Sequence, residues 1–510
     1  MSGFMGLPLP MMADAYKMSH FPLYPESSEM SAYGEFRTSY EKDAEDHRIV
    51  FYGIRYIIQN YVSKKWTMQD IEKTEIFLNT FNLMGTPFPF PKTLFQKFVS
   101  ENNGYFPVKI EALPEGTVIY PHVPVFQISA QNEYSSLVTF LETVITMVWY
   151  PSTVATLSRR AKHSIAQYFD ETVDSTNQFL LSSRLQDFGF RGCTSLEQSI
   201  IGGCAHLVNF EGTDTLSAAY YAQFELNNGK PVSSSIPATE HSVMTAYPTE
   251  LEALKKTIEV YGHGMISIVM DSYDYANCLN NLLPSVAALK LEKGGFLVIR
   301  PDSGDYVEAV IMGLEAGERV FGTTTNNKGY KVINGCSVIQ GDGISPESLK
   351  KILEAVKAKK FSAENVVFGM GGGLLQKVNR DTMSFATKLS MIMKKDGTRR
   401  DIMKTPKTDS GKISLPGSLM VFADTDDNNI PKVYPKYEIS SGNKLRSYPG
   451  KSNLLQVVYN NGPISDFEWD NFDTIRNRVE EQWNSLPPKA QVISKELEEL
   501  RKVVSKHLNQ

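Results

Sequence analysis

The sequence predicts an α/β fold built around an irregular (β/α) barrel, with a second, smaller α+β domain. Four apolar stretches each end in a short cluster of Asp, Arg or Gly, and a segment of helical period follows each cluster. The stretches are MISIVM before Asp271, FLVI before Arg300, SVIQ before Gly341 and NVVF before Gly369. Buried strands that alternate with helices are typical of a parallel sheet or barrel. Ligands bind at the carboxyl ends of such strands, so these clusters contain candidate site residues.

Composition indicates an ordinary globular protein. The 510 residues are 42% hydrophobic and 21% charged, which is enough for a sizeable core. With 52 basic and 57 acidic residues, the formal net charge is −5, which argues against bulk binding of nucleic acid. The apolar stretch 137–148 contains Glu142 and is too short to span a bilayer, so we expect a buried helix and no membrane association.

The cysteines and the start of the chain indicate a compartment. Four cysteines are widely spaced and form no CxxC motif, which argues against a disulfide framework or a zinc site. The first residues lack the basic and apolar regions of a secretory signal. Reduced thiols in a cytoplasmic protein are therefore expected.

The spacing of strand and helix patterns predicts the domain organisation. Residues 107–130 alternate apolar and polar side chains around Pro114-Glu115-Gly116, which indicates hairpins. The strand–turn–helix rhythm begins at about Pro151. The expected divisions are an N-terminal α+β domain over 1–150, a catalytic α/β barrel over 151–390, a C-terminal segment over 391–485 that packs with the N-terminal domain, and an extra C-terminal helix over 486–510.

Two C-terminal features leave alternatives open. The lysine- and arginine-rich stretch 391–412 is either an exposed loop or a basic flap over an anionic ligand. After Pro487-Pro488, the spacing of apolar residues predicts an amphipathic helix that packs on its own subunit, with contact to a partner as the alternative. These apolar residues are Ile493, Leu497, Leu500 and Val504.

A glycine-rich turn is a candidate phosphate site. Gly369-Met370-Gly371-Gly372-Gly373 follows a predicted strand and precedes the helical stretch LLQKV. A helix N-terminus of this kind offers backbone N–H groups and a favourable dipole to an anion, and Arg380 follows nearby. No GK[ST] follows the glycines, so this is not a Walker loop. The alternative is a tight strand-to-helix turn without a ligand.

Carboxylates after the neighbouring strands are candidate ribose ligands. Asp302 lies in Arg-Pro-Asp-Ser-Gly and Asp342 lies in Gly-Asp-Gly. Short carboxylates at strand ends suit the 2- and 3-hydroxyls of a ribose, or a magnesium ion through water. The alternative is a turn-forming Asp, which is common beside Gly and Pro. Two such residues in consecutive units favour a ligand.

Two further motifs carry candidate residues. Asp187-Phe188-Gly189 contains the DFG of protein kinases, but no HRD loop or VAIK strand accompanies it, so a kinase is rejected. Phe188 beside Arg191 suits stacking on a flat heterocycle with phosphate contact, with a core phenylalanine as the alternative. His241, beside Glu240, is a candidate general base, phosphate donor or phosphorylated nucleophile, with a structural histidine as the alternative.

Taken together, these segments resemble the nicotinamide phosphoribosyltransferase family over residues 13 to about 480. The matching segments are ADAYKMSH, FYGIRYII, ALPEG, WYPSTVAT, QDFGFRG, AHLVNFEGTDT, SIPATEHS, DSYD, IRPDSGD, VIQGDG and FGMGGGLLQKVNRD. The resemblance implies an irregular (β/α) barrel of the type II phosphoribosyltransferase kind. It also implies a homodimer with shared active sites that transfers phosphoribosyl from phosphoribosyl diphosphate to nicotinamide with Mg²⁺.

The resemblance assigns the residues that bind the base. Phe188 should stack on one face of the nicotinamide ring, and Tyr16 of the partner subunit on the opposite face. Asp214 should accept a hydrogen bond from the carboxamide NH₂, with Arg300 reaching the amide oxygen or the diphosphate. Ser235, within SIPATEHS, is also expected to bind substrate.

The resemblance also assigns the ribose, phosphate and catalytic residues. The ribose should be held by Asp302, Gly341 and Asp342. The 5′-phosphate should be bound by Gly371, Gly372 and Arg380, and the diphosphate side by Arg191, Arg37 and Lys388. The implied catalytic residues are His241, Asp302, Arg300 and Asp274. His241 matches the family histidine that ATP can phosphorylate, which implies ATP as an activating co-substrate, and the metal ligands stay unassigned.

The implied chemistry fits these residue types. Diphosphate leaves C1 as an oxocarbenium-like ribose forms, so the site needs anion clamps and an oriented nucleophile. The pyridine nitrogen has no proton to lose, so it needs no strong base. Nicotinate is the nearest alternative base, and the carboxylate of Asp214 would disfavour it. A non-catalytic nucleotide-binding protein and a barrel glycosidase are further alternatives, although no catalytic carboxylate pair marks the latter.

Overall fold

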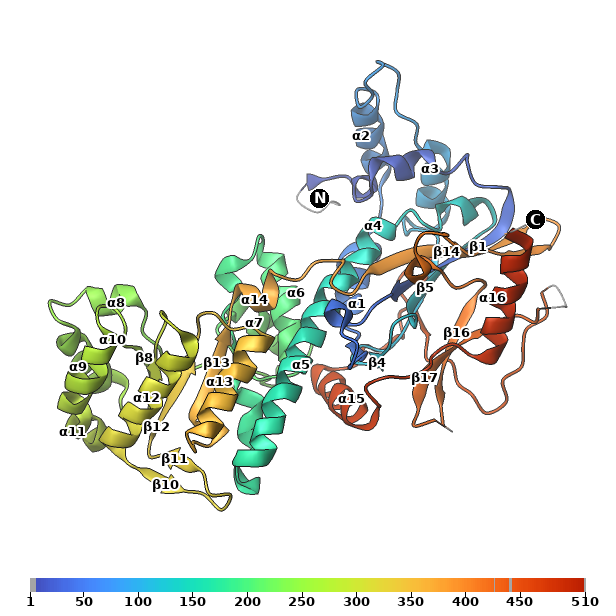
Figure 1. The fold of residues 1–510 in the computed structure, drawn as a ribbon. Helices are drawn as coiled ribbons and strands as arrows, with labels where there is room; N and C mark the ends of the chain where they lie inside the picture. Colours follow the sequence, from blue (N-terminus) through green and yellow to red (C-terminus); the bar gives the residue numbers. More distant parts are fainter. Residues whose placement is uncertain (1–5, 426, 440–442, 509–510) are drawn as a thin grey trace. The chain divides into compact units, whose positions relative to one another are not determined.

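The computed structural model describes residues 6–508 except 426 and 440–442. The chain forms two compact units (Figure 1). The first unit comprises Met1–Thr153, Arg380–Asp470 and Thr474–Gln510, and the second comprises Val154–Asn379 and Asn471–Asp473. Residues 1–5, 426, 440–442 and 509–510, which belong to the predicted N-terminal domain, C-terminal segment and extra helix, lie outside the described residues.

The first unit is built on a six-stranded antiparallel sheet. Its strand order is β15 (Arg399–Asp401), β14 (Phe385–Lys394), β1 (Ser27–Phe36), β5 (Pro124–Gln131), β3 (Lys109–Ala112) and β18 (Gln456–Asn460). Two smaller antiparallel pairs accompany it, β2 (Ile49–Val50) with β4 (Val118–Ile119), and β16 (Leu419–Asp424) with β17 (Ile430–Pro435). The helices are α1 (Ile54–Ile57), α2 (Met68–Leu78), α3 (Lys92–Glu101), α4 (Glu142–Ile145), α15 (Phe472–Ser485) and α16 (Lys495–Leu508).

Three segments of this unit are more irregular than the sequence predicted. Within 107–130, β3 and β5 pair directly, but the intervening β4 pairs with β2, so the region is not a set of simple hairpins. The stretch 391–412 is not a loop throughout, because β14 turns back into β15. The buried stretch 137–148 is a series of short helical turns, including α4, rather than one helix.

The C-terminal helix packs against its own unit, as the sequence predicts. Leu497, Leu500 and Val504 of α16 are buried, and α16 lies against β17. The preceding residue Ile493 pairs with Val433 of β17 in a parallel bridge. The apolar face of α16 is therefore used within the chain.

The second unit contains a curled parallel sheet, which confirms the predicted fold class (Figure 1). Its strand order is β7 (Gly212–Thr213), β6 (Leu185–Asp187), β13 (Val366–Met370), β12 (Cys336–Gln340), β9 (Phe296–Arg300) and β8 (Met265–Val269), and every neighbouring pair is parallel. The strands are apolar and buried because helices cover them. A separate antiparallel pair joins β10 (Thr323–Thr325) to β11 (Lys331–Ile333).

An irregular segment joins the two edges of this sheet. Gly212 in β7 pairs in parallel with Ser234, and Ser267 in β8 pairs in parallel with Ala238. The Ser234 N–H donates to the Glu211 carbonyl at 2.8 Å, and the Thr239 N–H donates to the Ser267 carbonyl at 3.0 Å. Segment 234–239 therefore closes the curled sheet into an irregular barrel and removes its open edges.

The helices of the second unit follow the strands that the sequence predicts. They are α5 (Trp149–Thr172), α6 (Leu196–Leu207), α7 (Leu216–Phe224), α8 (His241–Thr245), α9 (Glu250–Tyr261), α10 (Tyr275–Asn277), α11 (Leu283–Lys293), α12 (Tyr306–Phe321), α13 (Pro346–Ala358) and α14 (Gly372–Leu375). Helix α13 begins as predicted, with Ser345 as its N-cap and Pro346 at its first position. Ser345 and Ser348 form a reciprocal capping box, which satisfies two backbone N–H groups.

None of the four cysteines, Cys193, Cys204, Cys278 and Cys336, forms a disulfide in the structure. Within the described part of the chain, no helix combines the length and apolar character that crossing a bilayer requires.

Candidate functional site

The parallel strands of the second unit bring most of the predicted residues to one end of the barrel. Because all strands point the same way, the residues after their carboxyl ends share one rim. These residues are Phe188 after β6, Asp214 after β7, Ser235 and His241 in and after the closing segment, Asp271 and Asp274 after β8, Arg300 and Asp302 at the end of β9, Gly341 and Asp342 after β12, and Gly371 and Gly372 after β13. Tyr16, Arg37, Arg380 and Lys388 belong to the first unit.

The Phe188 ring lies against strand positions that have no side chain. A Cβ at Gly369 would overlap this ring, and a Cβ at Gly341 would lie 3.3 Å from it. The Phe188 N–H donates to the Met370 carbonyl at 3.0 Å, and the Arg300 guanidinium lies 5.6 Å from the ring centre. The glycines on β13 and after β12 thus leave a flat seat for an aromatic ring. The sequence predicted Gly369 as part of a phosphate-binding turn, but predicted no role for it in seating the base.

Asp214 lies beside this aromatic seat. Its carboxylate accepts a hydrogen bond from the Ser235 hydroxyl, and its N–H donates to the Asp187 carbonyl at 3.0 Å. The backbone bond places Asp214 next to the residue before Phe188. A carboxylate acceptor therefore stands near an aromatic face, which is suited to a planar ligand with an N–H donor.

His241 faces carboxylates from two neighbouring strands. Its Nε2 lies 3.6 Å from Asp302 Oδ2 and 3.9 Å from Asp271 Oδ1, and its Nδ1 lies 3.2 Å from the Ser272 hydroxyl. The histidine side chain is 47% exposed, so it reaches solvent as well as the carboxylates. Arg300 Nη2 lies 3.3 Å from Asp302 Oδ2. This arrangement can bind a charged group and hold a proton beside it.

Asp271 supports this cluster, although the sequence argument did not select it. Its Oδ2 accepts the Asp302 N–H at 2.8 Å and the Ser303 hydroxyl at 2.6 Å. Its Oδ1 is buried and has no hydrogen-bond partner among the described residues. Asp271 thus orients the Asp302 loop and leaves one oxygen for a ligand. Its position directly after an apolar strand was the available signal.

Asp274, the predicted catalytic carboxylate in DSYD, lies at the start of a helix. Its Oδ1 accepts the Asn277 N–H at 2.9 Å, which makes it the N-cap of α10. A capping carboxylate satisfies a backbone N–H that the helix leaves free. Nearby, burial and then the charge of Asp271 raise the pKa of Glu250.

The glycine turn follows β13 as predicted, but the helix after it is shorter than predicted. Helix α14 covers only Gly372–Leu375, so LLQKV is not a continuing helix. The first intrahelical bond runs from the Leu374 N–H to the Gly371 carbonyl, and the N–H groups before it are not used by the helix. The turn therefore offers backbone donors, with little dipole from a one-turn helix.

Gln376 joins the glycine turn to the loop that carries Phe188 and Arg191. Its Nε2 donates to the Gly189 carbonyl at 3.0 Å and lies 3.2 Å from the Cys193 thiol. Its Oε1 is buried without a hydrogen-bond partner among the described residues. Arg191 is exposed on this loop, so its guanidinium is available to an anion. Gln376 was not predicted as a site residue, because a single glutamine in LLQKV does not indicate which groups it contacts.

A cavity of about 470 Å³ runs inside the barrel. Its lining includes Phe188, Asp214, Ser235 and Arg300, which lie at strand ends. It also includes residues near strand starts, namely Met265, Phe296, Cys336 and Asn365. The cavity therefore extends from the rim that holds the predicted residues through the interior of the barrel, and most of its walls are apolar.

The first unit carries a separate group of cations. Register places Lys388 of β14 opposite Tyr33 of β1, and Arg37 follows β1. Burial, then the charges of Arg37 and Lys404, lower the pKa of Lys388. Arg37 Nε pairs with the fully buried Glu35 at 3.4 Å, while Arg37 Nη2 is buried without a hydrogen-bond partner among the described residues. Clustered cations of this kind favour an anionic ligand, and Lys404 joins the predicted pair.

Tyr16 and Arg380 occupy different environments in the first unit. Tyr16 lies on a short helical turn over Ala15–Ser19, and its side chain is 54% exposed. Arg380 begins the segment that leads into β14, and its carbonyl accepts the Phe385 N–H at 3.1 Å. The exposed ring of Tyr16 is free to contact a ligand or another molecule.

The described residues contain no cluster of three or more His, Cys, Asp or Glu side chains that could hold a metal ion by themselves. Magnesium, however, is often bound by one or two carboxylates together with substrate phosphates. Asp271 Oδ1 and Asp302 Oδ2 both lie near His241 Nε2, and the first is buried without a partner. These carboxylates fit a magnesium ion whose other ligands come from substrate or water.

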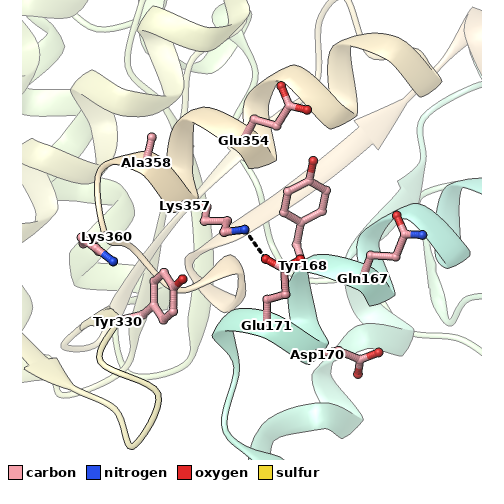
Figure 2. A pocket seen from close by; sticks show the side chains of 9 residues that line it. All are labelled: Gln167, Tyr168, Asp170, Glu171, Tyr330, Glu354, Lys357, Ala358 and Lys360. Atoms are coloured by element: carbon pink, nitrogen blue, oxygen red, sulfur yellow. Dashed lines mark ion pairs between the residues drawn. The ribbon is translucent and has the colours of Figure 1, made fainter.

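A second cavity of about 870 Å³ lies away from all the predicted residues (Figure 2). Figure 2 shows Lys357 of α13 paired with Glu171 of α5 across this cleft, with Tyr168 and Tyr330 on its walls. Its lysines are accompanied by carboxylates, including Glu354, so neither sign of charge dominates. The barrel rim, where arginine, histidine and aspartate converge on an aromatic seat, is the better candidate site.

Family models match both units of the chain. Residues 183–441 match the nicotinate phosphoribosyltransferase (NAPRTase) family, and residues 9–110 match the N-terminal domain of nicotinamide phosphoribosyltransferase. A nicotinamide phosphoribosyltransferase of Xanthomonas campestris is 36% identical over 461 residues, covering 88% of this chain and 94% of the relative. Another, from Acinetobacter baylyi, is 31% identical and covers 93% of this chain and 97% of the relative.

Solved structures share the fold at low sequence identity. Human nicotinic acid phosphoribosyltransferase superimposes with a TM-score of 0.62 at 15% identity, covering 96% of this chain and 99% of that one. A nicotinate-nucleotide pyrophosphorylase from Pyrococcus furiosus superimposes with a TM-score of 0.60 at 16% identity, covering 95% and 97%. These similarities support the barrel and the accompanying α+β domain.

Proposed function

The chain belongs to the nicotinamide phosphoribosyltransferase family, and from this premise we propose how its barrel rim carries out the transfer. The reaction joins nicotinamide to C1 of phosphoribosyl diphosphate and releases diphosphate, giving nicotinamide mononucleotide for NAD salvage. One observation carries the assignment to this rim. The Phe188 ring lies against Gly369 and Gly341, the Asp302 carboxylate lies beside Gly341, and the Asp214 carboxylate lines the same cavity as Phe188.

The base binds against Phe188. Stacking on the ring orients the pyridine, and Asp214 accepts a hydrogen bond from the carboxamide NH₂. Ser235 donates to Asp214, which holds that carboxylate in place. Arg300, 5.6 Å from the Phe188 ring centre, is placed to donate to the carboxamide oxygen or the departing diphosphate. Orientation of the pyridine nitrogen toward C1 is the main contribution of these residues.

The ribose and its phosphates bind along the neighbouring strand ends. Asp302, held by Arg300 and by the Asp271 carboxylate, accepts hydrogen bonds from the ribose hydroxyls, with Asp342 beside it. The backbone N–H groups of Gly371 and Gly372 face the 5′-phosphate, and Arg191 binds the diphosphate. As positive charge develops at C1, carboxylates on the sugar side stabilise it while arginine stabilises the leaving group.

Magnesium is proposed as the cofactor, with Asp271 and Asp302 as the protein groups that would hold it. When bound, the ion would neutralise part of the diphosphate charge and favour its departure. Asp271 otherwise holds the Asp302 N–H and the Ser303 hydroxyl, so it orients the ribose ligand whether or not the ion is bound.

Product analysis tests the function. Purified protein is incubated with phosphoribosyl diphosphate and either nicotinamide or nicotinate, with and without ATP. Nicotinamide mononucleotide and diphosphate are expected with nicotinamide, and little product is expected with nicotinate. Turnover of nicotinate but not nicotinamide would reverse the substrate assignment, and no diphosphate release with either base would contradict transferase activity.

Asp214→Asn is expected to lower kcat/KM for nicotinamide by roughly 10-fold or more, since a charged acceptor is replaced by a neutral one. The same change should improve nicotinate use relative to nicotinamide, because the like charge is removed. Steady-state kinetics with both bases measures the change. Ser235→Ala serves as the milder control, since it removes only the donor to Asp214. Unchanged kinetics in Asp214→Asn would show that this carboxylate does not contact the base.

ATP is proposed as an activating co-substrate through His241. A ring nitrogen of His241 would take the γ-phosphoryl group of ATP and release ADP. The 47% exposed side chain is accessible, and Asp271 and Asp302 orient the ring. Incubation with γ-labelled ATP should give acid-labile label in the wild type and none in His241→Gln. If the wild-type protein carries no label, ATP does not phosphorylate His241.

A homodimer with shared sites is proposed from the family and from exposed apolar groups. Leu216, Tyr220 and Phe224 lie four residues apart on α7 and are all exposed, which is typical of an interface. Tyr16 is exposed as well and would cover the second face of the base in the partner's site.

Complementation tests the shared sites. Mixing Tyr16→Ala with Asp302→Ala should restore about a quarter of wild-type activity, because half of the dimers are hybrids with one intact site. No recovery despite proven subunit exchange would contradict sharing. A cytoplasmic location is also proposed, since none of the four cysteines is in a disulfide.

A further inference from the structure

Two glycines let the base loop, residues 188–194, pack closely on the end of α14. A Cβ at Gly189 would lie 2.7 Å from the Leu375 side chain, and a Cβ at Gly192 would lie 2.7 Å from Gln376 Oε1. Because neither glycine has a side chain, the loop can approach the segment that follows the glycine turn. The loop that carries the aromatic ring and the turn proposed to bind phosphate are therefore in direct contact.

The Gln376 amide fastens the base loop to the glycine turn. Its Nε2 donates to the Gly189 carbonyl at 3.0 Å and lies 3.2 Å from Cys193 Sγ, which itself lies 3.5 Å from the same carbonyl. The backbone N–H of Gln376 donates to the Gly372 carbonyl at 3.0 Å. One residue therefore contacts both the neighbour of Phe188 and a glycine that is proposed to face the 5′-phosphate.

A second glutamine ties the far end of the base loop to the same helix. Gln198 Oε1 accepts the Thr194 N–H at 2.7 Å and the Thr194 hydroxyl at 3.0 Å, and its Nε2 donates to the Leu375 carbonyl at 3.2 Å. Both ends of the base loop are thus attached to the segment after the glycine turn, and Arg191 lies between the two attachments. A displacement of the turn is therefore passed to the loop through direct contacts.

We propose that Gln376 couples the two substrate sites, so that a phosphoribosyl group bound at the glycine turn raises the affinity of the site for nicotinamide. This inference rests on the proposed function, in which the base loop presents Phe188 to the base and Arg191 to the diphosphate. A phosphate that orders the turn also orders the loop, because the two are hydrogen-bonded. The base that binds next then loses less conformational freedom. Gln376 acts through the loop and the turn, so it is a positioning residue.

Calorimetric titration of the full chain with nicotinamide, with and without ribose 5-phosphate, measures this coupling. Ribose 5-phosphate carries the 5′-phosphate but no diphosphate leaving group, so both ligands can bind without reacting. In the wild type, saturating ribose 5-phosphate should lower the Kd for nicotinamide by roughly fivefold or more. Coupling between binding sites is reciprocal, so nicotinamide should lower the Kd for ribose 5-phosphate by the same factor.

Two substitutions of Gln376 remove the connection. Gln376→Met keeps the length of the side chain but removes the amide that donates to the Gly189 carbonyl. The coupling factor should fall to within about twofold of unity, while the Kd for nicotinamide alone stays within about threefold of wild type. Gln376→Glu keeps the shape but places an acceptor opposite the Gly189 carbonyl, and it should give the same loss of coupling.

Gln178→Met is the matched control. Gln178, on the segment before β6, also donates through Nε2 to two carbonyls, those of Phe169 and Val173, at 3.1 and 3.0 Å. This variant should lose a similar amount of Tm and keep the wild-type coupling factor. An unchanged factor in Gln376→Met, an equal loss in Gln178→Met, or no coupling in the wild type would overturn the proposal. Product analysis of the wild type tests transfer separately, so an active enzyme without coupling would reject this inference alone.

Discussion

Gly369→Ala is expected to raise the KM for nicotinamide at least about 10-fold, because a single methyl group would occupy the seat of the Phe188 ring. The Cβ would overlap ring atoms of Phe188, and the β13 backbone cannot retreat, since Gly369 pairs with Gln186 on the neighbouring strand. The ring must therefore move into the space of the base. The KM for phosphoribosyl diphosphate should change much less. Steady-state kinetics with each substrate varied in turn measures the difference.

A double substitution identifies the cause. If the methyl group acts by displacing Phe188, then Gly369→Ala should add little to the loss in a Phe188→Ala protein. Additive losses would instead indicate a general distortion of β13. Gly372→Ala is the control for the glycine turn, because a Cβ there has its nearest contact at 3.5 Å and fits without displacing a neighbour.

Asp302→Ala is expected to lower kcat/KM for phosphoribosyl diphosphate by about 100- to 1,000-fold. Hydrogen bonds to a charged group contribute about 1.5–3 kcal/mol each, and this carboxylate is proposed to bind the ribose. Its removal also leaves Arg300 and His241 without a neighbouring carboxylate at 3.3 and 3.6 Å. Diphosphate release under saturating nicotinamide measures the effect.

The neighbouring Asp305 supplies a matched control. Asp305 is the N-cap of α12 and accepts the N–H groups of Val307 and Glu308, both at 2.9 Å. Asp305→Ala should lower the free energy of unfolding by about 1 kcal/mol and leave kcat/KM close to wild type. Similar activity losses in both proteins would mean that loop stability, rather than ribose binding, explains the effect of Asp302.

Local patterns predicted the elements that carry the site. An apolar stretch followed by Asp, Arg or Gly predicted β8, β9, β12 and β13, since a strand in a parallel sheet is buried on both faces and ends at a turn. The start of α13 at Pro346 followed from its capping residues. Such signals lie within a few residues of one another, so the sequence alone contains them.

The sequence did not indicate which of two nearby carboxylates faces His241. In DSYD, Asp274 caps α10, whereas Asp271 lies 3.9 Å from His241 and holds the Asp302 loop. Residue type and spacing allow either role to either residue. Which of the two aspartates faces His241 depends on where the chain turns after β8, and the start of α10 determines that turn.

The sequence pattern also did not predict how the barrel closes. Segment 234–239 contains Pro237 and lacks an apolar run, yet its two ends pair with β7 and β8. A short bridge of this kind is selected by the spacing of two strand edges, which form from distant parts of the chain. No periodicity marks it.

By itself, the sequence determined the α/β class, the strands of the barrel, the residues at their carboxyl ends and the likeness to one enzyme family. Tertiary structure alone decided that Phe188 lies on Gly369 and that Asp271 joins His241. The physical reason is that strand formation depends on neighbours in sequence, whereas contact, burial and coupling between charges depend on distances between residues that only folding brings together.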